Sequence, residues 1–108
     1  MNNKMVIDAL SGLNVPVAFL KYTGTAKPYI TFFFYNERGE VFAENEEVAT
    51  RYSLQVDVWS SGNYTALVNQ VKDALKSVGF SRIDAKDLYE DDTKIYHKAM
   101  FFRYTDIV

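Results

Sequence analysis

Apolar and polar residues alternate most regularly in the stretch RYSLQVDVW, residues 51–59. Such alternation is typical of a β-strand, because successive side chains of a strand point to opposite faces of the sheet. One face would carry Tyr52, Leu54, Val56 and Val58, and the other would carry Ser53, Gln55, Asp57 and Trp59. The pattern therefore places a tryptophan on the polar face, where a large aromatic ring needs a specific role.

A second strand is predicted for YITFFFY, residues 29–35, which is rich in aromatic and β-branched side chains. Ile30, Phe32 and Phe34 would share one face, while Tyr29, Thr31, Phe33 and Tyr35 would share the other. Because both faces require cover, we expect this strand to lie in the interior of the sheet.

The remaining strands and turns are predicted from shorter signals. The tetrad NERG, residues 36–39, ends in glycine, as many tight hairpin turns do. The residues after it would then return as a short strand and continue into an acidic loop. These signals predict strands at 17–23, 41–43, 80–89 and 95–105, a loop at 44–50, and turns at 24–28, 36–39 and 90–94.

Two segments show the three- and four-residue apolar spacing of amphipathic helices, residues 3–12 and residues 63–78. Ser61 or Asn63 can cap the start of the second helix. Gly79 stands where a left-handed residue often ends a helix. Together with the strands, the two helices predict a single α+β domain over residues 1–108, with one antiparallel or mixed β-sheet and both helices packed on one of its faces.

Composition narrows the range of functions. The formal net charge is −2 and the twelve basic residues are dispersed, so we expect neither sequence-specific nucleic-acid binding nor attraction to anionic lipid. No apolar run approaches the roughly 20 residues of a membrane span, and no signal peptide is expected, so the sequence predicts a soluble protein without a membrane partner. The absence of cysteine excludes disulfides, thiolate chemistry and cysteine-ligated zinc. Aromatic residues make up 16% of the chain, which fits either core packing or an assembly surface.

The sequence offers no recognisable catalytic, cofactor-binding or metal-binding motif. His97 is the only histidine, and its place within a predicted strand favours a structural or surface role over a catalytic one. The five glycines are too scattered for a phosphate-binding loop. Two acidic clusters are interpreted as solvated charge that limits aggregation, or as surfaces complementary to a basic partner. They comprise Glu37, Glu40, Glu44, Glu46 and Glu47, and Asp84, Asp87, Glu90, Asp91 and Asp92.

The stretch TRYSLQVDVWSSGNYTALVNQVKDALKSVGF resembles the tail terminator proteins of long-tailed bacteriophages, a group that includes tail completion, minor tail and tail-to-head joining proteins. The similarity lies in a strand ending in QVDVW, a Ser/Gly turn and an amphipathic helix that closes on GF. LNVPVAF, PYITFFFY, FAENEEVATRY and YHKAMFFRYT extend it, in order, over nearly the whole chain.

This resemblance implies a non-enzymatic virion or prophage protein without a cofactor, located in the tail or neck and assembled in the cytoplasm of the bacterial host. Such proteins form a ring, typically a hexamer, that caps the tail tube, ends its polymerisation and joins the tail to the head. The implied partners are copies of the chain itself, the tail-tube protein and the head-completion or connector protein.

We therefore expect the sheet face opposite the helices to form a subunit or partner interface. Trp59, beside Gln55 and Asp57, would anchor it; alternatively, Trp59 caps the core at the strand end and its N–H meets a backbone carbonyl. Glu46 and Glu47 with Arg51 would form ion pairs between subunits, or exposed pairs worth less than ~1 kcal/mol. Two other functions remain open: a small ligand-binding domain or enzyme with an aromatic-lined pocket near Tyr35, Trp59 or His97, and another neck or tail-tube component.

Overall fold

The computed structural model describes residues 3–43 and 46–107, with side chains for 3–37 and 49–106. Its five strands form one sheet in the order β1-β2-β3-β5-β4, and two α-helices and a short 3-10 helix accompany it. The elements are α1 (Asn3–Leu10), the 3-10 helix (Ser11–Leu13), β1 (Val17–Phe19), β2 (Tyr29–Ala43), β3 (Glu46–Ser60), α2 (Thr65–Ser77), β4 (Ser81–Glu90) and β5 (Ile95–Ile107).

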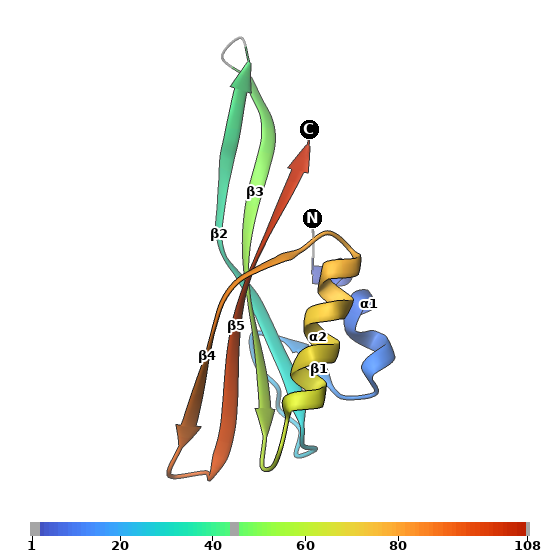
Figure 1. The fold of residues 1–108 in the computed structure, drawn as a ribbon, viewed down its shortest axis with the longest axis vertical. Helices are drawn as coiled ribbons and strands as arrows, with labels where there is room; N and C mark the ends of the chain where they lie inside the picture. Colours follow the sequence, from blue (N-terminus) through green and yellow to red (C-terminus); the bar gives the residue numbers. More distant parts are fainter. Residues whose placement is uncertain (1–2, 44–45, 108) are drawn as a thin grey trace.

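The sequence predicts an antiparallel or a mixed sheet, and the structure shows a mixed one. β1 runs parallel to β2, whereas β2, β3, β5 and β4 pair in antiparallel order. Both helices lie on the same side of the sheet, over the half in which β2 begins (Figure 1). The predicted α+β class with two helices on one face is confirmed.

The core fills the space between the helices and the sheet, because the apolar stripe of each helix meets the apolar face of the strands. The register of β2 and β3 sets Ile30 opposite Val58 and Phe32 opposite Val56, so the predicted helix-facing residues of the two strands meet. The fully buried residues of this cluster are Val6, Leu10, Ile30, Phe32, Leu54, Val56, Val58, Val71, Leu75, Phe80, Met100 and Phe102.

The prediction of a turn at 36–39 is wrong, as is the predicted loop over residues 46–50, whereas its residues 44–45 lie outside the described part of the chain. Residues 36–43 continue β2, and β3 already begins at Glu46, so the two strands form one long hairpin. The pairing shifts register after Phe34 and again after Gly39, which is the signature of β-bulges. Asn and Gly suit a bulge for the same conformational reasons that suit them to a turn, so the local sequence resembled a tight turn. The hairpin extends beyond the C-terminal end of β5 (Figure 1).

The two predicted end signals of α2 are both present. Asn63 Oδ1 accepts a hydrogen bond from the Thr65 N–H at 2.9 Å, which satisfies one of the free donors at the helix start. Gly79 follows the helix with a φ of +105°, a conformation that side chains with a Cβ rarely adopt. The ring of Tyr104 also lies 2.8 Å from the position that a Cβ on Gly79 would occupy. Glycine is therefore required there for conformation and for space.

We predict that Gly79→Ala lowers the free energy of unfolding by about 1–3 kcal/mol, because it combines backbone strain with a clash against Tyr104. Urea unfolding followed by circular dichroism measures this change. Gly12→Ala is the matched control, since no atom lies within 4 Å of its added Cβ. An equal loss of stability in both variants would contradict the explanation.

Candidate assembly surface

The sheet face opposite the helices is rich in aromatic side chains. Register aligns Tyr29, Trp59, His97 and Leu88 in one row across β2, β3, β5 and β4. Phe33, Gln55, Phe101 and Asp84 form a second row four residues further along β2. Residues directly opposite each other in a sheet share a face, so these rows and the residues between them define one surface. We call the part of this surface on β2, β3 and β5, together with Tyr35, which packs on Phe33 and Phe101, the assembly face. Its residues are Tyr29, Thr31, Phe33, Tyr35, Gln55, Asp57, Trp59, His97 and Phe101.

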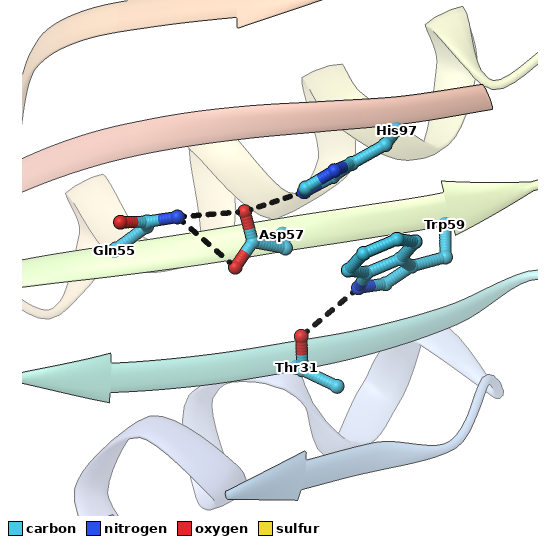
Figure 2. Close-up of polar contacts among 5 residues, drawn as sticks. All are labelled: Thr31, Gln55, Asp57, Trp59 and His97. Atoms are coloured by element: carbon cyan, nitrogen blue, oxygen red, sulfur yellow. Dashed lines mark hydrogen bonds and ion pairs between the residues drawn. The ribbon is translucent and has the colours of Figure 1, made fainter. Parts of the chain in front are cut away.

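A hydrogen-bonded cluster centred on Asp57 occupies the middle of the assembly face (Figure 2). Asp57 is only 4% exposed, and its Oδ1 lies 2.7 Å from Nε2 of His97. Gln55 Nε2 donates to the two carboxylate oxygens of Asp57 at 3.0 and 3.3 Å. A buried carboxylate loses its hydration, so these partners are what make its burial tolerable. The contact also fixes the orientation of the imidazole ring.

Stacked aromatic rings extend the cluster to either side. The Trp59 ring stacks on His97 with centroids 3.7 Å apart and on Tyr29 with centroids 5.8 Å apart. At the other end of the assembly face, Tyr35 makes edge contacts with Phe33 and Phe101. Stacking and edge contacts immobilise large apolar rings, so a partner would bind them with little further loss of side-chain entropy. Tyr35 remains 46% exposed.

The structure brings three of the six predicted interface residues together. Trp59, Asp57 and Gln55 share the assembly face within one segment of β3. Arg51 lies eight residues before Trp59 on the same strand, roughly 26 Å away at the usual rise per residue. The side chains of Glu46 and Glu47 lie outside the described residues, so their predicted pairing with Arg51 stays a prediction.

Trp59 does not cap the core through a backbone carbonyl. Its ring nitrogen instead donates to the side-chain hydroxyl of Thr31 at 3.0 Å (Figure 2). Thr31 and His97 were not among the predicted site residues, although both complete the cluster. The alternation of β2 already placed Thr31 on the aromatic face. His97 is forty positions from Asp57 in the sequence, and only the register of β3 with β5 brings it into contact.

A second polar contact lies at the edge of the helix side, between α2 and the last two strands. Tyr64 Oη donates to Asp87 Oδ1 at 2.6 Å, and Lys98 Nζ lies 3.2 Å from the same oxygen. Burial, together with this hydrogen bond, raises the pKa of Tyr64 to about 12. Hydrogen bonds from Tyr64 and Lys98 lower the pKa of Asp87 below its usual range. The contact ties the start of α2 to β4.

Hollows in the surface lie elsewhere. Five of them, with volumes of about 350 to 470 Å³, are lined by residues of α1, α2, β4, β5 and the β3–α2 turn. None of these five is lined by Tyr35, Trp59 or His97, where an aromatic pocket had been considered. Within the described residues, no group of three or more potential ligands is placed to hold a metal ion. No helix in that part of the chain is long and apolar enough to cross a membrane.

A mixed five-stranded sheet with its helices on one face and packed aromatic rings on the other defines an α+β domain with one sheet face left uncovered. Its sequence matches the family model described as tail completion protein gp17 over residues 20–105. The chain therefore belongs to this family, whose members are structural proteins of the bacteriophage tail.

The fold is also found in a solved virion. A chain in the structure titled "Virion of native gene transfer agent (GTA) particle" superimposes with a TM-score of 0.54 and 11% sequence identity. The match covers 88% of this chain and 81% of that chain. At this identity the similarity shows a common fold. No curated protein matches the sequence.

We predict that Asp57→Ala lowers the free energy of unfolding by about 1–3 kcal/mol, because it leaves the side chains of Gln55 and His97 without their acceptor. Asp57→Asn keeps an acceptor oxygen and should cost less. Thermal unfolding of both variants tests this order. Asp73→Ala, on the exposed side of α2, is the control and should change stability by no more than about 0.5 kcal/mol.

The contact between Tyr64 and Asp87 predicts a pH dependence. The folded pKa of Asp87 is lowered, so its contribution to stability is present above the unfolded pKa of about 4 and is lost as the pH falls below it. Asp87→Asn should therefore flatten the acid limb of the stability profile between about pH 5 and 2. Urea midpoints across this range measure the effect, with Asp73→Asn as the control. An unchanged acid limb in Asp87→Asn would refute the assignment.

Proposed function

We propose that this protein forms a ring that caps the tail tube, ends its polymerisation and provides the surface to which the head connector docks. Membership of the tail completion family supports a role at the end of the tail. The assembly face supports protein–protein contact, because its aromatic rings are already packed in place and remain partly exposed. This face is the single observation that carries the proposal.

The proposed ring is a closed assembly of identical copies, which we take to be a hexamer. Closed rings require heterologous contacts, in which one patch of a subunit meets a different patch of the next. The assembly face, with Trp59, Asp57 and Gln55 at its centre, would then contact the tail tube, the head connector or a neighbouring copy. These contacts place the protein in the neck or at the head-proximal end of the tail, following assembly in the host cytoplasm.

Deletion of the gene in its phage tests the proposal directly. We expect overlong tails, or tails and filled heads that remain separate, because nothing would end tube growth or complete the junction. Electron microscopy of lysates measures tail length and joining, and expression of the intact chain in trans should restore normal particles. Virions of normal length and infectivity without the protein would overturn the proposal. Short or absent tails would indicate a tube component instead.

A further inference from the structure

The sheet ends in two open strand edges on opposite sides of the molecule. In the described part of the chain, β4 is the last strand on one side and pairs only with β5. On the other side, β1 pairs with β2 only at Ile30, Thr31 and Phe32, so β2 lacks a partner strand there from Phe33 onwards. Open edges present backbone N–H and C=O groups that can pair with another chain.

We name these two surfaces by their strands. The β4 edge comprises residues 81–94, which are β4 and the turn after it. The β1 edge comprises residues 17–28, which are β1 and the segment that leads to β2. They belong to different strands and have different sequences, so a contact between them would be heterologous, as a ring requires.

Exposed apolar side chains gather at both edges. At the β4 edge, the exposed fractions of Ile83, Leu88 and Tyr89 are 44, 43 and 46%. At the β1 edge, those of Phe19 and Leu20 are 43 and 60%. These five are most of the eight large hydrophobic residues that are exposed in the described part of the chain. Clusters of this kind favour burial against another protein surface.

The charges of the two edges are opposite. Residues 81–94 contain five carboxylates, two lysines and one arginine, which gives the β4 edge a net charge of −2. Residues 15–36 contain Lys21 and Lys27 as their only charged side chains. Both lysines are exposed, as are Asp91 and Asp92 in the turn after β4. Opposite charge on two surfaces of one chain favours contact between copies and disfavours contact between like edges.

The register of the sheet places the matching features at corresponding heights. Tyr29 and Leu88 stand in one row, so Lys27 and Asp91, which lie just beyond them, are at the same end of the sheet. Phe19 stands in the row of Ala85, which lies two residues from Ile83 in β4. If a second copy lies beside the first at the same height along the strands, Lys27 of one copy therefore comes near Asp91 of the other. The exposed apolar side chains of the two edges then also lie near each other.

Strand directions also agree. β1 runs parallel to β2. Three antiparallel pairings lead from β2 through β3 and β5 to β4, so β4 runs in the direction opposite to β1 and β2. Copies related by rotation about an axis along the strands would thus place β4 of one copy antiparallel to β1 and the open part of β2 of the next. Antiparallel pairing is the commoner and slightly more stable arrangement.

We propose that the β4 edge of each copy docks against the β1 edge of the next copy, and that this head-to-tail contact builds the ring. The inference rests on the proposed ring and names its subunit contact. The occupant of each edge is a second copy of this chain. The contact leaves the assembly face uncovered, so that with the ring axis along the strands it would line the inner or the outer wall of the ring.

Disulfide trapping in assembled particles tests the contact, and because the chain has no native cysteine, any disulfide between its copies must form from introduced thiols. Two double variants join the edges at different heights: Lys27→Cys with Asp91→Cys, and Leu20→Cys with Ile83→Cys. Mild oxidation of purified virions should give a ladder of covalent multimers on a non-reducing gel. Each single variant should stay monomeric, because like edges do not meet. Ser11→Cys with Asn69→Cys, exposed on the helix side, is the control and should stay monomeric too.

Charge reversal separates specific docking from chance collision. Lys21→Glu with Lys27→Glu should lower the multimer yield of the Leu20–Ile83 cysteine pair by about tenfold. Adding Asp91→Lys and Asp92→Lys to the same chain should restore it. Unfolding temperatures of the purified variants confirm that each one folds.

If both double-cysteine variants are incorporated into particles but run only as monomers on the non-reducing gel, the proposed edge contact is wrong. Disulfide dimers from the single variants would overturn it as well, since they would show like edges meeting. Either result leaves the proposed function standing if deletion of the gene still gives overlong or unjoined tails. Normal tails after deletion would remove the ring itself, so the two failures are distinguishable.

Discussion

The fold depends on burying β3 on both faces although helices cover only one of them. Leu54, Val56 and Val58 are fully buried against the helices. On the opposite face Asp57 is almost as well buried, and the cover comes from neighbouring side chains in place of a second layer of helices. A carboxylate in this position is stable only with hydrogen-bond partners. His97 and Gln55 provide them, so the assembly face is part of the folded structure as well as a surface for partners.

Much of this arrangement follows from periodicity. A slip of one residue in β3 would exchange its apolar and polar faces, so alternation alone assigns Val56 to the core and Asp57 to the opposite side. The helical stripe of residues 63–78 and the glycine after it likewise define α2. These predictions are correct because each depends on residues close together in the sequence. The family resemblance drawn from QVDVW and the helix after it is confirmed by the match over residues 20–105.

Prediction from the sequence is wrong, or cannot be made, where pairing between distant segments decides the structure. NERG has the composition of a turn. The strand continues through it because β3 pairs alongside, at thirteen of its residues. The contact between Asp57 and His97 depends on the register of β3 with β5, which no local pattern fixes. Trp59 was placed on the correct face, but its partner, Thr31, lies on a different strand. Side-chain direction is thus predictable from alternation, whereas the identity of the neighbour is not.

The two kinds of exposed surface on this sheet suit different partners. The assembly face is dominated by rigid stacked rings around a hydrogen-bonded Asp57–His97 pair, and such a surface binds through shape and apolar area. The edges combine open backbone groups with opposite charges, which favour a defined register and direction. In the proposed ring, contacts between subunits would bury the β4 edge and the β1 edge of each copy and leave both faces of its sheet uncovered. One face would then carry helices and the other aromatic rings, so with the ring axis along the strands the inner and outer walls of the ring would be chemically distinct.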